Sequence, residues 1–215
     1  MPEVSAGETF EALTPGGPAR VRLTPAGADG GGSAGLLCLG HGAGGGTDAP
    51  DLVAVTEAAA AAGWTVARID QPYRVAGRRA PAPAPRLDEA WVAVVAGLRE
   101  RFAGGLLVTG GRSSGARVAC RTAVATGASG VLCLAFPLRP PRRPDVSRRD
   151  ELLGAGVPVL VVQGERDPFG GPQEFPPFDL TQRIDVVAVA GDHSLRRSAG
   201  EVAAAVTGWL AQRVA

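Results

Sequence analysis

The segment most informative about the fold is Gly110-Gly111-Arg112-Ser113-Ser114-Gly115-Ala116-Arg117. Residues 106–109 before it form a short apolar run, which is typical of a strand buried in a parallel sheet. Residues 116–123 after it mix small and polar side chains in the manner of a packed helix. The turn between them has the pattern G-x-S-x-G, and its glycines leave room for a strained backbone at the central serine. A plain glycine-serine loop is the alternative, but the flanking strand and helix favour a serine presented above the edge of a sheet.

The composition is that of one domain without a strong charge. The chain has 215 residues, 45% of them hydrophobic, and a formal net charge of +1. We therefore expect a single domain over residues 1–215 with a sizeable core. All 22 basic residues are arginine, and lysine and asparagine are absent, as in proteins encoded by GC-rich DNA. Nucleic-acid binding would need clustered positive charge or a recognised module, and because the sequence has neither, we expect no nucleic-acid partner.

The three cysteines, Cys38, Cys120 and Cys133, each lie within an apolar segment. An odd number of cysteines in such places suits buried free thiols in a reducing compartment better than disulfides. Residues 1–13 have neither a basic head nor an apolar run long enough for export, and no stretch has the length of a membrane span. These features predict a cytoplasmic protein without a membrane partner.

Short apolar runs alternate with helical patterns along most of the chain. The expected strands cover residues 9–13, 19–23, 36–39, 64–69, 106–109, 131–136, 157–163 and 184–190. The expected helices cover residues 51–62, 87–102, 116–123, 150–153 and 201–214. The first two strands flank the turn 14–18 and are expected to form an antiparallel hairpin. The remainder predicts an α/β fold, with a mostly parallel central sheet and helices on both faces.

A serine hydroxyl attacks a carbonyl only when a base takes its proton and an acid orients that base. The chain has two histidines; His193 follows the last expected strand, and Asp167 follows the strand before it. The chain order Ser113, Asp167, His193 is that of the α/β-hydrolase fold. Asp192 is a competing acid, although a neighbour in sequence rarely reaches the ring from the side, and Asp145 is a more distant alternative.

The glycine loop after the third expected strand, which contains His41 and Ala43, has a separate expected task. Backbone amides can stabilise the oxyanion of a tetrahedral intermediate by about 3 kcal/mol per donor. We expect the donors to be the amides of Ser114, directly after the nucleophile, and Ala43, with Gly44 as the next candidate. A phosphate-binding loop is disfavoured because the Lys-Ser/Thr pair of such loops is missing. His41 is then expected to have a structural role in fixing the loop.

Several motifs together resemble the compact α/β hydrolases related to dienelactone hydrolase. They lie at residues 39–45, 77–81, 110–115, 136–141, 163–169 and 191–194, so the resemblance covers the chain from about residue 36 onward. The branch that they resemble also includes a subunit of a metazoan histone-acetyltransferase complex. The resemblance implies an α/β-hydrolase fold, but it does not imply a substrate. Dienelactone hydrolases carry a cysteine nucleophile where this chain has Ser113, so their lactone chemistry is not carried over.

The loops at the same edge of the sheet indicate a shallow site for a small acyl substrate. Where lipases insert a lid, this chain has only the short connection 137–149, so no large lid is expected. The candidates for an apolar substrate-binding wall are Tyr73, Phe136, Leu138 and Phe169. Several loop arginines at this edge either attract an anionic ester or are simply solvated. They are Arg74, Arg78, Arg79, Arg139, Arg142 and Arg143.

The sequence therefore predicts a serine hydrolase that cleaves a small carboxylic ester through an acyl-enzyme, with a thioester or an amide as the second choice. A catalytically silent binding module with the same fold is the alternative. Two histidines and no cysteine pair at ligand spacing cannot build a zinc site, so no metal and no cofactor are expected. The oligomeric state is left open.

Overall fold

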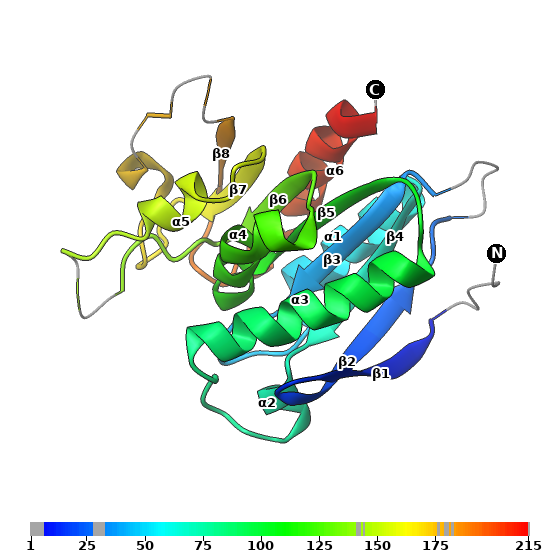
Figure 1. Ribbon diagram of the computed structural model, residues 1–215. Helices are drawn as coiled ribbons and strands as arrows, with labels where there is room; N and C mark the ends of the chain where they lie inside the picture. The colour runs from blue at the N-terminus through cyan, green and yellow to red at the C-terminus, as the bar shows by residue number, and fades with distance from the viewer. Residues whose placement is uncertain are drawn as a thin grey trace.

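The computed structural model describes residues 7–27, 33–140, 143, 145–175, 177–178, 181 and 183–214 (Figure 1). These residues form one eight-stranded sheet with the strand order β1-β2-β4-β3-β5-β6-β7-β8. The strands are β1 (Thr9–Thr14), β2 (Gly17–Thr24), β3 (Gly35–Gly40), β4 (Trp64–Asp70), β5 (Leu106–Arg112), β6 (Gly130–Leu134), β7 (Val159–Gly164) and β8 (Ile184–Val189). All pairs among β3 to β8 are parallel, whereas β2 pairs antiparallel with both β1 and β4.

Helices cover both faces of the sheet. In Figure 1, α3 and α4 lie in front of the sheet, and α1 and α6 lie behind it. The helices are α1 (Pro50–Ala61), α2 (Pro72–Val75), α3 (Ala84–Arg101), α4 (Ser114–Thr126), α5 (Arg149–Leu153) and α6 (Ala199–Val214), with short 3-10 turns at Pro172–Glu174 and Arg196–Ser198. Because the crossover helices hide both faces, strands β3 and β7 are buried along their whole length rather than in alternation.

The core consists of two apolar clusters, one on each face of the sheet. Trp91 of α3 belongs to the cluster beneath α3 and α4, which also contains the inward side chains of the hairpin. Trp64 of β4 and Trp209 of α6 belong to the cluster beneath α1 and α6. The sheet is therefore held rigidly between two packed layers, and its carboxyl edge is a firm platform for the loops that follow each strand.

The expected fold class and the antiparallel hairpin are confirmed, with differences in detail. Strand β5 continues through Arg112, because its two glycines remain paired with β3 and β6. Strand β6 ends at Leu134, two residues earlier than expected, because Ala135 has a φ of 47° and breaks the extended chain. Helix α2 lies in a segment that the sequence indicated as loop. Between β6 and α5, the described residues contain no helix that would act as a lid.

The three cysteines are free and buried, as the sequence predicted. The sulfur atoms of Cys120 and Cys133 lie 3.5 Å apart. Burial raises the pKa of the Cys38 and Cys133 thiols, so both remain protonated and unreactive near neutral pH. Among the helices of the described ranges, none combines the length and the hydropathy that crossing a bilayer requires.

Candidate active site

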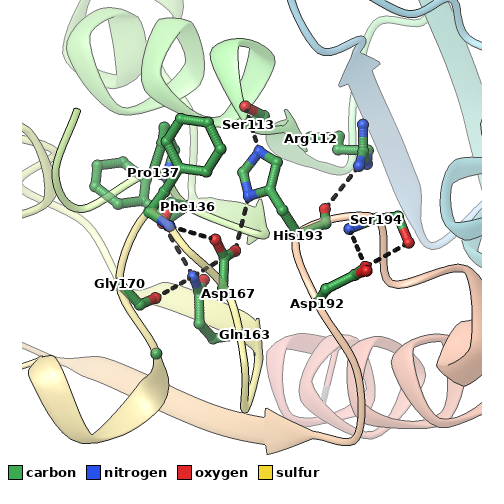
Figure 2. Close-up of polar contacts among 12 residues, drawn as sticks. Arg112, Ser113, Phe136, Pro137, Gln163, Asp167, Gly170, Asp192, His193 and Ser194 are labelled. Atoms are coloured by element: carbon green, nitrogen blue, oxygen red, sulfur yellow. Dashed lines mark hydrogen bonds and ion pairs between the residues drawn. The ribbon is translucent and has the colours of Figure 1, made fainter. Parts of the chain in front are cut away.

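Ser113 occupies the turn between β5 and α4 with a backbone that few non-glycine residues adopt. Its φ is 53° and its ψ is −106°, and its amide donates a 2.9 Å hydrogen bond to the carbonyl of Leu134. Residues are held in such conformations only when the surrounding structure fixes them, and these conformations cluster at functional sites. The turn directs the Ser113 hydroxyl toward the ring of His193 (Figure 2).

The glycines of the G-x-S-x-G turn are required by the close approach of strand β3. A Cβ atom on Gly111 would lie 2.3 Å from the carbonyl oxygen of Gly40, and one on Gly115 would lie 2.5 Å from the same oxygen. Real Cβ atoms do not approach a backbone oxygen so closely. Turn strain is therefore not the only reason for these glycines, because β5 and α4 both pack closely against the end of β3.

A continuous chain of hydrogen bonds joins Ser113, His193 and Asp167. The distance from His193 Nε2 to Ser113 Oγ is 2.9 Å, and the distance from His193 Nδ1 to Asp167 Oδ2 is 2.7 Å. The side chain of Asp167 is fully buried. Since a carboxylate only accepts hydrogen bonds, the ring proton lies on Nδ1, and the unprotonated Nε2 can accept the serine proton.

The carboxylate of Asp167 is held by two further groups. The amide of Phe169 donates to Oδ1 over 2.8 Å, and the side-chain amide of Gln163 donates to Oδ2 over 2.9 Å. Gln163 is itself buried at the end of β7 and also lies within hydrogen-bond distance of the carbonyls of Phe136 and Gly170 (Figure 2). Sequence reasoning missed Gln163; its only signal is a polar residue inside an otherwise apolar strand.

Arg112 connects the turn to the loop of the histidine. Its Nη2 donates to the main-chain carbonyl of His193 over 2.6 Å, and its Nε lies 3.1 Å from Oδ2 of Asp51 (Figure 2 shows the first contact). Asp51 is completely buried in the first turn of α1. Burial raises the pKa of Asp51, and the charge of Arg112 opposes that effect. Neither residue was recognised from the sequence.

The two competing acids do not contact the histidine ring. Asp192 is directed away from it and accepts hydrogen bonds from the amide and the hydroxyl of Ser194, at 2.9 and 2.6 Å (Figure 2). These hydrogen bonds lower the pKa of Asp192, which is exposed to solvent. Asp145 is exposed in the connection before α5. Among the three acids considered from the sequence, only Asp167 is brought to the ring.

The glycine loop after β3 is fixed by His41 and Tyr73. The amide of Gln71 donates to His41 Nε2 over 3.0 Å, so the ring proton lies on Nδ1, which donates to the carbonyl of Gly42 over 2.7 Å. Burial lowers the pKa of His41, which keeps the ring neutral. The hydroxyl of Tyr73 donates to the carbonyl of Ala43 over 3.0 Å. These contacts give His41 the structural position that the sequence indicated.

The two amides expected to form an oxyanion hole are those of Ser114, directly after Ser113, and Ala43 in the glycine loop. Ser114 is the first residue of α4, where helical amides have no acceptor within the helix. Within the described ranges, neither amide has a hydrogen-bond acceptor. The glycine loop passes close to Ser113, because a Cβ atom on Gly42 would lie 3.7 Å from Cβ of Ser113.

The structure corrects part of the expected substrate-binding wall. Phe136 and Leu138 are buried in the core cluster beneath α3 and α4, with exposures of 0% and 1%, so neither presents a surface to a substrate. Phe169 is partly exposed, and its ring lies 4.3 Å from that of His193, centroid to centroid. Tyr73 is mostly buried beside the glycine loop. Of the four expected wall residues, Phe169 is therefore the one with a partly exposed ring beside His193.

A strained serine linked through a histidine to a buried aspartate, at the carboxyl edge of a sheet without a large lid, defines the α/β-hydrolase class. The chain belongs to the alpha/beta hydrolase domain family, whose model matches residues 33–211. No curated protein matches the sequence.

Solved structures with this fold include several serine hydrolases. XC6422 from Xanthomonas campestris, a serine hydrolase without a lid, is 20% identical over 96% of both chains, with a TM-score of 0.73. A serine hydrolase homologue from Coxiella burnetii is 18% identical over 99% of this chain and 100% of that chain, with a TM-score of 0.72. Est1E from Butyrivibrio proteoclasticus is 15% identical over 96% of this chain and 98% of that chain, with a TM-score of 0.76. At these identities the similarity is one of fold.

Proposed function

We propose that the protein is a serine hydrolase that cleaves a small carboxylic ester through an acyl-enzyme. The observation that carries this proposal is the unbroken hydrogen-bond chain from Ser113 through His193 to the buried Asp167. The family to which the chain belongs, and structural neighbours that are serine hydrolases, agree with it. In this proposal Ser113 is the nucleophile, His193 the general base and Asp167 the group that orients the ring.

The chemistry follows from the positions of the protons. Ser113 Oγ attacks the ester carbonyl while its proton moves to His193 Nε2, and the buried Asp167 stabilises the resulting imidazolium. The tetrahedral intermediate then expels the alcohol, which takes the proton from Nε2. Water attacks the acyl-enzyme with the same base, and the proton returns to Ser113 as the acid leaves. One ester and one water thus give one acid and one alcohol.

The backbone amides of Ser114 and Ala43 are the proposed donors to the oxyanion. Each such donor is worth about 3 kcal/mol in the transition state when it is fixed beforehand. The hydrogen bonds of His41 and Tyr73 to the glycine loop provide that fixation for Ala43. The strained turn provides it for Ser114, since the position of that amide is set by the conformation of Ser113.

The sequence motifs, the open connection after β6 and the buried cysteines support further proposals on the closer relatives, the bond that is cleaved and the location of the reaction. We infer kinship with the dienelactone hydrolase branch that includes the histone-acetyltransferase subunit, but with ester rather than lactone chemistry because the nucleophile is serine. The open connection after β6 suits a small substrate, and thioesters or amides are secondary candidates. The three buried free thiols fit a reducing compartment, so we place the reaction in the cytoplasm.

A burst experiment tests this function. Short p-nitrophenyl esters mixed with a known concentration of protein should release a rapid, stoichiometric burst of p-nitrophenol, followed by slower turnover. Ser113→Ala should abolish both phases, and His193→Ala should reduce them by several orders of magnitude while the melting temperature stays near that of the wild type. Folded wild-type protein that hydrolyses none of these esters would contradict the proposal and favour a binding module.

A further inference from the structure

An open cavity of about 550 Å³ lies beside Tyr73, whose hydroxyl contacts the glycine loop. Its lining consists of Tyr73, the loop that leads from α2 to α3, and the first turn of α3. A smaller pocket of about 100 Å³ adjoins it and shares four of its lining residues, including Tyr73 and Ala82. Alanine and proline side chains of residues 80–83 give the cavity an apolar wall, and Arg78, Arg79 and Arg86 give it a cationic one.

The three arginines of this cavity have no counter-charge. No acidic residue lines the cavity, and across the described ranges none of the three is within ion-pair distance of a carboxylate. Arg139, near the same edge, differs in this respect, since it pairs with Glu174 at 2.9 Å. Arg78 and Arg79 therefore differ from Arg139, although all three belong to the group of loop arginines expected at this edge. Arg142 lies outside the described residues.

Uncompensated guanidinium groups beside apolar surface suit one kind of ligand. Guanidinium groups bind carboxylate and phosphate with paired hydrogen bonds, and three of them without an acid lower the free energy of an anion in the cavity. The apolar wall of residues 80–83 suits a short hydrocarbon segment attached to that anion. A neutral, purely hydrophobic ligand would leave the arginines unused, and a cation would be repelled by them.

The cavity is connected to the proposed nucleophile through Tyr73. The Tyr73 hydroxyl contacts the carbonyl of Ala43, and the preceding Gly42 lies against Ser113. To place its reacting carbonyl at Ser113 and its other end in the cavity, a substrate would have to extend past the glycine loop and Tyr73. Only a substrate with a spacer between its carbonyl and its charged end can occupy both places.

We propose that this cavity binds the anionic end of the substrate, so that the preferred substrates are esters whose acyl chain ends in a carboxylate or a phosphate group. The inference rests on the proposed serine hydrolase function and adds the substrate class to it. Arg78, Arg79 and Arg86 bind the anion, and the wall of residues 80–83 packs against the spacer. The positive potential of the three arginines also draws such substrates toward the site from solution.

Two esters that differ only in charge test the substrate class. The p-nitrophenyl hydrogen ester of adipic acid carries a terminal carboxylate, whereas its methyl ester has the same acyl chain without the charge. We expect kcat/KM for the charged ester to exceed that for the neutral ester by at least about tenfold at low ionic strength, the range of one charge-assisted hydrogen bond. Added salt should reduce the ratio. A ratio near or below one would overturn the proposal.

Arginine variants test whether the cavity causes the preference for the charged ester. Arg78→Gln and Arg86→Gln should each lower the ratio, and the triple variant that adds Arg79→Gln should bring it nearest to one, because each substitution removes one positive charge from the cavity. Arg99→Gln is the matched control, since Arg99 is exposed at the opposite end of the same helix α3 and should leave the ratio unchanged. An equal fall in the control, or an unchanged ratio in the triple variant, would locate the preference elsewhere and refute the cavity assignment.

Calorimetry separates the failure of this inference from the failure of the proposed function. Adipate should bind Ser113→Ala protein in an isothermal titration and should not bind the same protein with the triple arginine change. Binding to both proteins or to neither would contradict the anion site even if the wild type hydrolyses esters. Arginine-dependent binding of adipate by a protein that hydrolyses no ester would keep the anion site and contradict the hydrolase function.

Discussion

Arg112 donates a 2.6 Å hydrogen bond to the main-chain carbonyl of His193, so the residue before Ser113 also holds the loop of His193. The other side of the same guanidinium group faces the buried carboxylate of Asp51. A charged group anchored at one end by an ion pair positions its other end well. The arrangement links the N-terminus of α1, the turn at Ser113 and the loop of His193 into one unit.

We predict that Arg112→Met lowers kcat by about 10- to 100-fold with little change in KM, because misplacement of His193 affects proton transfer more than substrate binding. The change also leaves Asp51 buried without a partner, which costs about 3 kcal/mol of stability. The double variant Arg112→Met with Asp51→Asn removes that buried charge and should recover most of the melting temperature. Recovery of kcat together with stability in the double variant would show that Arg112 has no positioning role.

The two neighbouring acids should differ sharply in their effect on turnover. Asp167→Asn should lower kcat by about 10³- to 10⁴-fold, because the ring then loses the acceptor that selects its tautomer. Asp192→Asn should change kcat by less than about tenfold, since Asp192 contacts Ser194 rather than the ring. Circular dichroism and melting curves of both variants provide the folding control. A larger loss of kcat in Asp192→Asn would mean that the orienting acid is misassigned.

Alanine at two glycines should have opposite effects on stability. Gly115→Ala should lower the free energy of unfolding by more than about 2 kcal/mol, because the new Cβ would lie 2.5 Å from the carbonyl oxygen of Gly40. Gly97→Ala, on the exposed face of α3 with no atom within 4 Å of the new Cβ, should raise it by up to about 1 kcal/mol. Urea unfolding measures both. A neutral Gly115→Ala would contradict the close packing of α4 on β3.

Acidification should weaken the fold through His41. Its pKa in the folded protein is lowered by burial, so the unfolded chain takes up a proton more readily as the pH falls below about 6.5. The stability that the neutral ring provides is therefore present above that pH and is lost on acidification. His41→Gln lacks this titration, and its melting temperature should fall less between pH 7.5 and about pH 5.5 than that of the wild type. Parallel curves for the two proteins would refute the assignment.

The sequence was sufficient for the fold because each element carries its own local pattern. Apolar runs in the parallel strands and the G-x-S-x-G turn can be identified without knowledge of the contacts between them. The positions of Ser113, Asp167 and His193 followed from the rule that side chains after parallel strands meet at one edge. With two histidines in the chain, few arrangements of a base were available.

The sequence was not sufficient for contacts between distant segments. Asp51 follows a proline at the start of a helix, where an acid is ordinary, so nothing local indicates that it is buried against Arg112. Gln163 ends an apolar strand, and its role depends on a loop that folds back over it. The prediction that Phe136 and Leu138 line the substrate site was wrong because the chain breaks at Ala135 and both side chains then enter the core. No local sequence pattern indicates this break.

Labelling with a fluorophosphonate, followed by intact-mass analysis and peptide mapping, shows whether Ser113 is the nucleophile. We predict one adduct per chain, located on Ser113, which persists in Ser114→Ala and disappears in Ser113→Ala. His193→Ala should slow the labelling by several orders of magnitude, because the serine then has no base. An adduct on Ser114, or no adduct on correctly folded wild-type protein, would contradict the account.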